Sequence, residues 1–173
     1  EKTKSGGGGL LLKGNPISSF TIQTEARELV LGKWFHILES LMDVSYVCFE
    51  ACDLGGNRTH LLGEALRNLA HLSDLSLESN SISSLLPLKE FLKNHNGLTH
   101  LSLEENQITS LSGLETATSL TNLDLNRNKI TDISGLAKLT GLTVLDLNYN
   151  KIMSVLPLKI LTSLRHLDIS HKF

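Results

Sequence analysis

Two cysteines are the first residues of the chain that suggest chemistry. Cys48 and Cys52 are the only cysteines among its 173 residues, and they lie in the stretch VSYVCFEACDL, residues 44–54. Two nearby thiolates can serve redox chemistry or bind a metal ion. Whether these two can act together depends on the element that carries them.

A second combination suggests hydrolysis. His100 and Ser102 alternate with apolar residues and would share one side of a strand, and Asp124 would lie on the next strand. His, Ser and Asp are the residue types of a catalytic triad. They would stand on a shallow surface, however, with no nearby glycine-rich turn or helix N-terminus to form an oxyanion hole. We therefore predict no catalytic residue and no enzyme activity.

The elements that would position these residues form a repeat. Four segments follow the pattern LxxLxLxxNxI, and they start at Leu72, Leu98, Leu120 and Leu142. Their asparagines are separated by 26, 22 and 22 residues and are Asn80, Asn106, Asn128 and Asn150. A further copy, LRHLDISHK, places Lys172 where asparagine belongs.

Each unit has the alternation of a half-buried strand at its fourth and sixth positions. Such a short strand cannot bury its apolar side alone, but stacked strands form a parallel sheet with a spacing of ~4.8 Å. Other apolar positions would fill the interior, and in two successive units they are Ile130, Ile133, Leu136 and Leu139, then Ile152, Val155, Leu158 and Leu161.

The asparagines have a predicted structural role in the turn after each strand. A side-chain amide offers both donors and an acceptor to backbone groups that would otherwise be buried unpaired. Cys52 takes the same position in the unit before Asn80. The predicted structural ladder therefore comprises Cys52, Asn80, Asn106, Asn128 and Asn150.

This pattern resembles the leucine-rich repeat family, strictly over residues 72–173 and with one degenerate unit over 44–173. The 22-residue units are similar to those of bacterial internalins and of a nuclear regulatory subunit of protein phosphatase 1. The 28 residues from Cys52 to Asn80 resemble the longer class of ribonuclease inhibitor, in which cysteine replaces asparagine. The resemblance implies an α/β solenoid, an arc or horseshoe with a concave parallel β-sheet. Helices are expected on the convex side in the N-terminal half, and short 3₁₀ or extended segments in the C-terminal half.

The N-terminal part is less regular. Apolar residues spaced by three and four predict a helix over 59–72, capped by Thr59 or Asn57. Further upstream, 10–17 resembles the tail of another unit, and 24–41 has a helical pattern. Residues 1–43 are predicted to be a degenerate repeat or an N-terminal capping region, and 44–173 to hold five to six repeats, the last truncated. We expect one domain over 1–173 that is part of a longer chain.

The register of the repeat separates the two cysteines. Cys52 is expected to be buried in the turn, whereas Cys48, between Val47 and Phe49, is expected to be exposed on the concave side. They are therefore poor candidates for one metal site or a mutual disulfide. His100 and His166 would lie roughly 14 Å apart, too far to share a zinc ion. We predict no metal site and no cofactor.

Charge and hydropathy limit the partners. The formal net charge of −2 gives no basic field that would favour nucleic acid, and we expect no nucleic-acid partner. No apolar run approaches the ~20 residues of a membrane helix, so we expect no membrane span. The free cysteine pair and the absence of a visible export signal favour a cytoplasmic location over a secreted or cell-surface one.

The concave face is where we expect a partner to bind. The resemblance implies a protein-interaction module without catalysis, either in an intracellular regulatory role or in internalin-like adhesion. The alternative is a sensing or substrate-binding region of a larger enzyme or receptor. The predicted partner-binding residues are Tyr46, Glu50, Asp74, Glu78, His100, Glu104, Asn122, Asp124, Arg127, Asp146, Asn148, Tyr149, His166 and Asp168.

Two acidic stripes run across this face. Glu50, Glu78 and Glu104 share one repeat position, and a second position holds Asp124, Asp146 and Asp168. A negative field of this kind would favour a basic protein segment, although exposed acidic residues also simply solvate a surface. Tyr46 and Tyr149 are the expected aromatic anchors.

Overall fold

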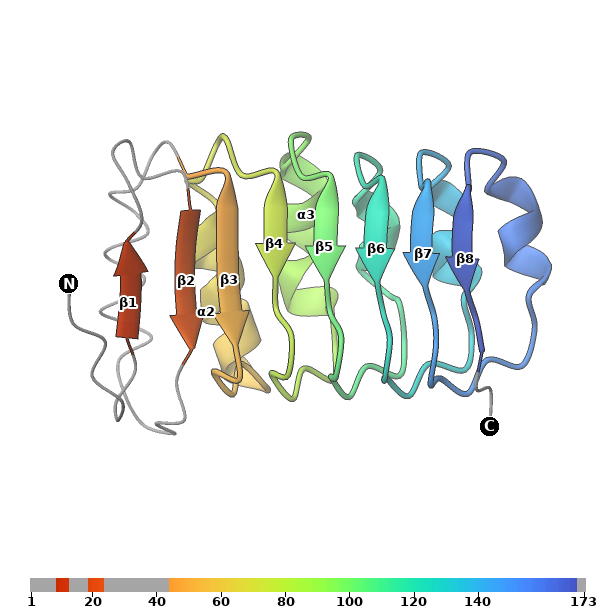
Figure 1. Ribbon diagram of the computed structural model, residues 1–173, viewed down its shortest axis with the longest axis horizontal. Coiled ribbons are helices and arrows are strands. Elements are labelled where there is room, and N and C mark those ends of the chain that lie inside the picture. Colours follow the sequence, from red (N-terminus) through yellow and green to blue (C-terminus); the bar gives the residue numbers. More distant parts are fainter. Residues whose placement is uncertain (1–8, 13–18, 24–43, 171–173) are drawn as a thin grey trace.

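A computed structural model describes residues 9–12, 19–23 and 44–170 (Figure 1). Its strands form one sheet in chain order from β1 to β8. The strands are β1 (Gly9–Leu12), β2 (Ser19–Gln23), β3 (Tyr46–Glu50), β4 (Asp74–Ser76), β5 (His100–Ser102), β6 (Asn122–Asp124), β7 (Val144–Asp146) and β8 (His166–Asp168).

The repeat positions match across the sheet, because β2 to β8 pair in parallel with equivalent residues opposite each other. The central leucines align from Leu75 to Leu101 and Leu123, and the next outward position aligns Ser102 with Asp124. This one-to-one register carries any residue that recurs in the sequence into a row that crosses the strands.

Helical segments cover the opposite side of the sheet (Figure 1). They shorten along the chain, from a ten-residue α-helix to single 3₁₀ turns, as the repeat length falls to 22 residues. In order they are α2 (Asn57–Leu66), η1 (Leu86–Leu88), α3 (Lys89–Asn94), η2 (Leu114–Thr116), η3 (Ser134–Lys138) and η4 (Leu156–Ile160). The predicted change from helices to 3₁₀ segments is confirmed.

The predicted helix over 59–72 is shorter and starts earlier than expected. Its N-cap is Gly56, with a φ of 60° and no side-chain cap, so neither Thr59 nor Asn57 caps it. The Thr59 hydroxyl instead donates to the carbonyl of Leu54 in the preceding loop. Leu69 and Leu72 lie beyond the end of α2 and are fully buried in the core.

The core lies between the sheet and the helical segments. In the third unit Ile130, Ile133, Leu136 and Leu139 have no exposed surface, as predicted. Burying an aliphatic side chain of this size contributes about 1.5–3 kcal/mol, so each unit is stabilised mainly by its contacts with its neighbours. In the following unit the pattern weakens, because Val155 is 44% exposed.

The N-terminal strands differ from the prediction. The segment 10–17 was expected to be the tail of a repeat, but β1 pairs antiparallel with β2, as in a hairpin. The strand that continues the parallel array is β2, in which Phe20 and Ile22 align with Val47 and Phe49 of β3. The predicted helix over 24–41 lies outside the described residues.

Left-handed backbone recurs in the turn that follows each strand. The residue immediately before each ladder position has a φ between 51° and 59°, and none of these residues is glycine. They are Ala51, Ser79, Glu105, Arg127 and Tyr149. This conformation costs an L-residue about 1–2 kcal/mol, and it turns the next side chain, the asparagine, into the interior.

Candidate functional site on the concave sheet face

The asparagine ladder fixes the edge at which the strands of the concave face end. Each side-chain oxygen accepts a backbone N–H of the preceding unit: Ile108 donates to Asn128 at 3.0 Å and Ile130 donates to Asn150 at 3.0 Å. At the start of the ladder the amide of Cys52 donates to Asn80 at 2.8 Å. The predicted ladder residues are therefore buried and bonded between repeats.

The amide nitrogen of each asparagine completes the ladder. Asn128 Nδ2 donates to the carbonyls of Leu103, Leu125 and Asn126 at 2.9–3.1 Å. Asn106 and Asn150 make equivalent bonds in their own units. One side chain thus joins two strands and closes its own turn, which satisfies buried groups that would cost about 1–3 kcal/mol each if left unpaired.

Cys48 corrects one prediction. Its side chain was expected to be exposed, but only 7% of the residue is accessible, and Cys52 is buried at 9%. Cys48 is flanked on its own strand by Tyr46 and Glu50, and strands pair with β3 on both sides, opposite Thr21 and Ser76. Cys48 therefore lies on an interior strand of the sheet, and its thiol is hydrogen-bonded to Tyr46.

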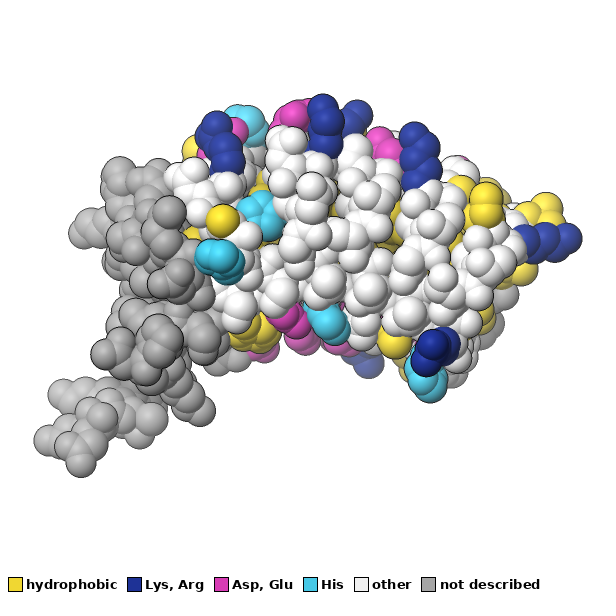
Figure 2. Space-filling view, turned by 90° about the horizontal axis from the view of Figure 1, so that it is seen from above, with side chains coloured by type: hydrophobic (Ala, Val, Ile, Leu, Met, Phe, Trp, Pro, Cys, Tyr) yellow, Lys and Arg dark blue, Asp and Glu magenta, His cyan; other side chains and the backbone are white. Residues whose placement is uncertain are grey.

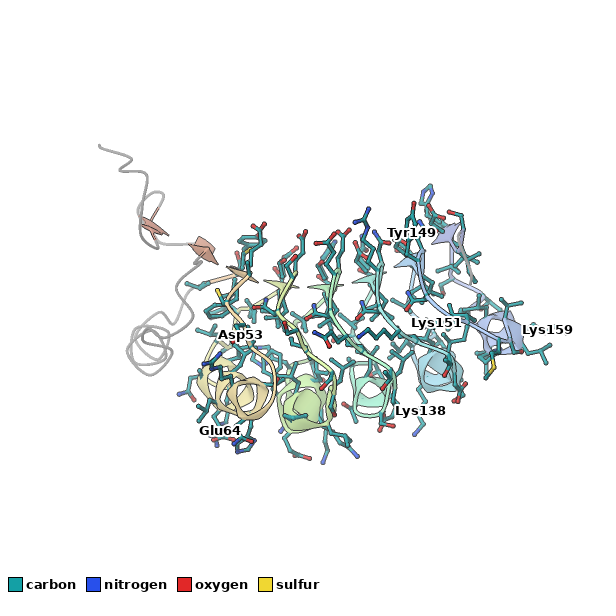
Figure 3. The ribbon with its side chains drawn as sticks, turned by 90° about the horizontal axis from the view of Figure 1, so that it is seen from below. Asp53, Glu64, Lys138, Tyr149, Lys151 and Lys159 are labelled. Carbon is teal, nitrogen blue, oxygen red and sulfur yellow. The ribbon has the colours of Figure 1, made fainter. Side chains whose placement is uncertain are left out.

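The outward side chains of the central strands line an open groove of about 540 Å³ over β3 to β7. In Figure 3 the strands lie along one side of the molecule and the helical segments along the other, with Tyr149 on the strand side and Lys138 and Lys159 on the helix side. The groove brings together these predicted residues: Tyr46, Asp74, Glu78, His100, Glu104, Asn122, Asp124 and Asp146.

Six predicted residues lie outside the lining of this groove: Glu50, Arg127, Asn148, Tyr149, His166 and Asp168. Asn148 is 9% exposed; its backbone N–H donates to the carboxylate of Asp146, and its side-chain oxygen accepts the hydroxyl of Ser170. The groove also contains residues that were not in the predicted set, among them Ser76 and Val144. Both residues stand at outward repeat positions. The alternation of inward and outward side chains along each strand could therefore have predicted them as part of the face.

Carboxylates within the groove raise one another's pKa. Partial burial raises the pKa of Glu78, Glu104 and Asp124 above the ordinary values, and repulsion from neighbouring carboxylates adds to it. Glu78 is affected by Glu50, Glu105 and Asp124, and Glu104 by Glu78, Glu105 and Asp146. Glu78, Glu104 and Asp124 are thus coupled to neighbouring carboxylates. Together with Glu50, Asp146 and Asp168 they are called the acidic band.

Tyr46 lies at the β3 end of the groove. It is 38% exposed, and burial raises the pKa of its phenol to about 12, with a hydrogen bond to Cys48 and the nearby charges of Asp74 and Glu50 adding to the effect. The phenol therefore stays protonated and offers a hydrogen-bond donor beside an aromatic surface.

Arg127 is held at the rim of the face. Its guanidinium lies 2.8 Å from the carboxylate of Glu105 and 5.2 Å from the centre of the Tyr149 ring. Glu105 also accepts the hydroxyl of Ser79 at 3.0 Å. These contacts link four adjacent repeats through the residues with left-handed backbone.

His100, Ser102 and Asp124 do not assemble as a triad. Among the described residues no hydrogen bond joins these three side chains: His100 Nδ1 lies 3.3 Å from Asp74 and 2.9 Å from the hydroxyl of Thr99, and Asp124 accepts the backbone N–H of Asn126. Within the described part of the chain, no cluster of three or more His, Cys, Asp or Glu side chains could hold a metal ion.

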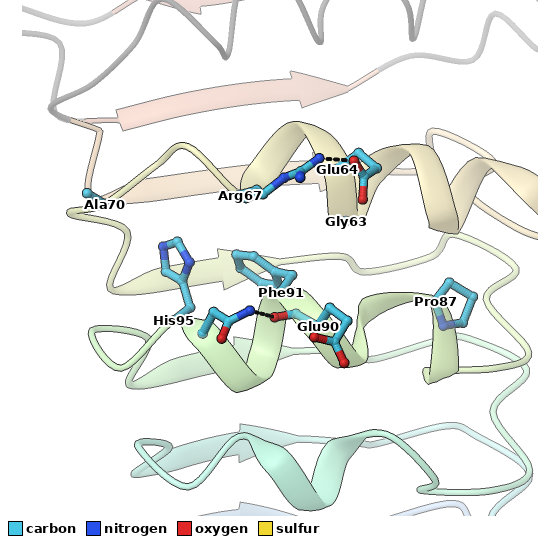
Figure 4. Close-up of a pocket in the computed structure, with 9 residues that line it drawn as sticks. Gly63, Glu64, Arg67, Ala70, Pro87, Glu90, Phe91 and His95 are labelled. Atoms are coloured by element: carbon cyan, nitrogen blue, oxygen red, sulfur yellow. Dashed lines mark hydrogen bonds and ion pairs between the residues drawn. The ribbon is translucent and has the colours of Figure 1, made fainter.

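A second hollow lies on the convex side between α2 and α3 (Figure 4). Its wall contains His95, which is 7% exposed, bonds the carbonyl of Leu69 through Nε2 at 2.5 Å and packs against Phe91 with ring centres 4.6 Å apart. Gly63 permits the close approach of the two segments, because a Cβ there would lie 3.0 Å from the carbonyl of Pro87. These contacts explain the hollow as a helix-packing feature.

Comparison with known proteins agrees with this geometry. The family model described as Leucine Rich repeats (2 copies) matches residues 96–138. The chain contains leucine-rich repeats. No curated protein matches its sequence. Proteins of this family are in general binding modules for other proteins.

Solved structures share the fold of this leucine-rich repeat chain. An internalin (InlF) from Listeria monocytogenes is 29% identical, with a TM-score of 0.65 over 78% of this chain and 37% of its own. Internalin C2 from the same species is 21% identical, with a TM-score of 0.55 over 89% of this chain and 81% of its own. The chain therefore spans little more than a third of the length of InlF.

TLR13 in its complex with ssRNA13 is 22% identical to the chain, with a TM-score of 0.65 over 84% of the chain and 21% of TLR13. A leucine-rich repeat fold has thus been solved together with RNA. The expectation of no nucleic-acid partner, which rested on net charge, is not supported. No helix among the described residues has the length and apolar character to cross a membrane.

Proposed function

We propose that the chain is a protein-interaction module that binds its partner through the concave sheet face and catalyses no reaction itself. The observation that carries this proposal is the groove over β3 to β7, lined by outward side chains from five successive strands. Because equivalent repeat positions align across the sheet, one partner segment can contact several repeats at once.

The acidic band gives the partner its expected charge. Complementary charge speeds association and selects among partners more than it adds affinity. A partner segment rich in Lys or Arg is therefore the best match for Glu78, Glu104, Asp124 and Asp146. Tyr46 and the rim residues Arg127 and Tyr149 would contact the flanks of such a segment.

Affinity capture with a matched pair of variants tests the proposal. The double variant Asp124→Lys/Asp146→Lys reverses charge within the groove, and Glu64→Lys/Glu90→Lys makes the same change on the convex side. We expect partners to be lost from the groove variant and retained by the convex variant. Equal retention by both variants, with both correctly folded, would refute binding through this face.

A second candidate is a sensing or substrate-binding region of a larger enzyme or receptor. It is favoured by the small share of the similar chains that is matched, 37% of InlF and 21% of TLR13. Binding would use the same face, while catalysis would lie in another domain. The complete reading frame discriminates between the two, since only this candidate requires an adjacent catalytic or signalling domain.

A further inference from the structure

We infer that the segment recognised by the concave face is an amphipathic α-helix with Lys or Arg along one side, lying across the strands of the sheet. This inference rests on the proposed function and adds the conformation and the spacing of the partner. It depends on three properties of the groove. These are its unneutralised negative charge, the spacing of its carboxylates across the strands, and a mostly uncharged row of side chains at the first position of each strand.

The groove carries negative charge that the described side chains do not neutralise. Its lining, all of it within the described part of the chain, contains five carboxylates and neither Lys nor Arg. The carboxylates are those of Asp74, Glu78, Glu104, Asp124 and Asp146. Figure 2 shows acidic side chains along the lower edge of the view, the sheet side, with some Lys and Arg toward its right-hand end, whereas both signs of charge alternate along the upper, helix side.

Arg127, a basic side chain close to the band, is already engaged. Arg127 contacts Glu105 at 2.8 Å and covers the ring of Tyr149, outside the lining of the groove. His100 faces Asp74 at 3.3 Å, so only that carboxylate has a partner of potentially opposite charge. Glu78 and Asp146, by contrast, make no ion pair among the described side chains. A partner must therefore supply the positive charge.

The spacing of the band matches a helix laid across the strands. Adjacent strands are ~4.8 Å apart, and each repeat from β3 to β8 contributes one carboxylate of the band. These carboxylates lie in two offset rows, because Asp124 aligns with Ser102 and not with Glu104, and the rows are separated by two residues, ~6.6 Å along the strands. The spacing of a helix is therefore compared with the spacing across the strands. Residues on one face of an α-helix recur every three or four positions, which is ~5.3 Å along its axis. Over four strand intervals the two series differ by only ~2 Å, well within the reach of a lysine side chain.

An extended partner matches less well. Side chains on one face of a β-strand recur every ~6.6 Å, so over the same four intervals its cations would run ~7 Å ahead of the carboxylates. Flexible side chains can correct such an offset once, but not along the whole band. The repeated spacing therefore favours the helix.

The row of side chains at the first position of each strand is mostly uncharged. Tyr46, His100, Asn122 and Val144 stand at one repeat position on β3, β5, β6 and β7, with Asp74 between the first two. Tyr46 and Val144 are apolar surfaces at the two ends of this row. A helix with cations on one side and uncharged or apolar residues on the adjoining side would contact both rows.

Defined peptides test the inference on the 173-residue chain. The probe is an alanine-based peptide of about 18 residues, ~27 Å long as a helix, with Lys at every third or fourth position along one face. Its isomer has the same composition, with the Lys residues spread around the helix. We expect binding of the one-faced peptide, measured by fluorescence anisotropy at low salt, to be at least about fivefold tighter than that of the isomer.

Variants locate the binding. Glu104→Gln/Asp124→Asn should weaken binding of the one-faced peptide by about fivefold, and circular dichroism should show that the bound peptide gains helix. The convex variant Glu64→Gln/Glu90→Gln should leave both unchanged. A single-stranded RNA oligonucleotide, repelled by the band, should not compete.

Several results would overturn the inference. They are equal affinity for the isomer, tighter binding of an extended peptide with alternating Lys and Thr, a loss of affinity in the convex variant, or displacement of the peptide by RNA. The proposed function would survive the first two if partner capture still depended on Asp124 and Asp146. If capture did not depend on them, concave-face binding itself would be wrong.

Discussion

At the scale of single residues, the structure separates side chains that maintain the turn from side chains that remain available on the surface. Asn106 and Asn148 both lie in the turn that follows a strand, but their contacts differ. The side chain of Asn106 donates to three carbonyls in two repeats, whereas Asn148 donates its backbone N–H to Asp146 and accepts the hydroxyl of Ser170. The pattern LxxLxLxxNxI predicted the first. Nothing in the pattern distinguished the second from an exposed neighbour, because its burial depends on the residue that the next repeat places beside it.

Asn128 tests the ladder. Asn128→Ala leaves the amide of Ile108 and the carbonyls of Leu103, Leu125 and Asn126 without this partner. We expect a loss of at least about 3 kcal/mol in the free energy of unfolding, measured by urea denaturation. Asn68→Ala, an exposed site after α2, should change stability by less than about 0.5 kcal/mol. A similar small change at Asn128 would contradict a structural role for the ladder.

Ala51 tests the left-handed position. At a φ of 53° an alanine is strained, and glycine is not. Ala51→Gly is expected to stabilise the chain by about 0.5–1 kcal/mol, since the relief of strain exceeds the added chain entropy of glycine. Ala70→Gly, at a position without positive φ, should be neutral or destabilising by urea denaturation. Destabilisation by Ala51→Gly would show that the turn tolerates alanine without strain.

The two cysteines give a prediction that reverses the sequence-based one. Because Cys48 and Cys52 are both buried, both should react slowly with an aromatic disulfide reagent in the folded chain and rapidly in denaturant. Single Cys→Ala variants assign the two rates. Rapid modification of Cys48 in the native chain would mean that its burial on β3 is transient.

At the scale of elements, the strands are coupled by charge as well as by hydrogen bonds. Glu78 stands near Glu50 and Asp124, and its pKa is raised by burial and by these neighbours. A carboxyl whose folded pKa exceeds its unfolded value binds more protons in the folded state, so its contribution to stability falls as pH rises through that window. Glu78, Glu104 and Asp124, whose pKa values are raised, therefore destabilise the array at neutral pH and less so in acid.

Glu78→Gln isolates this effect. The variant should be more stable than the parent at pH 7 by a few tenths of a kcal/mol, a small value because the side chain is solvent-screened. The gain should disappear as pH falls below the ordinary glutamate pKa, where both states are protonated. Glu90→Gln, at the first turn of α3, should give no gain, because an acidic residue is favourable at a helix start. A gain at Glu78 that persisted in acid would have another cause.

The elements also show what the sequence could predict. The strands β4 to β8 and the shortening of the helical segments followed from the repeat spacing alone. The strand β2 was missed because Phe20 and Ile22 replace the leucines and Glu25 stands where the asparagine belongs. The antiparallel pairing of β1 could not be foreseen, since a hairpin and a degenerate repeat share the same alternation of apolar residues.

At the scale of the whole molecule, stability should vary along the solenoid. Repeats in the middle contact a neighbour on each side, whereas Leu167 of β8 is 43% exposed and its equivalent Leu145 is 1% exposed. In the 173-residue chain we expect backbone amides bonded between β5 and β6 to exchange with deuterium more slowly than those between β7 and β8. Uniform protection along the array would indicate that it unfolds as a single cooperative unit.

The asparagine ladder has a consequence for how such a chain can change over evolution. Each asparagine accepts from the unit before it and donates to carbonyls of that unit and of its own turn, so a duplicated 22-residue block such as 120–141 carries a complete set of these bonds. Duplication would lengthen the sheet by one strand, ~4.8 Å, and add one aspartate to the band. Gain or loss of whole repeats would therefore change the length of the segment that the face can bind, in steps of one strand and without a new fold.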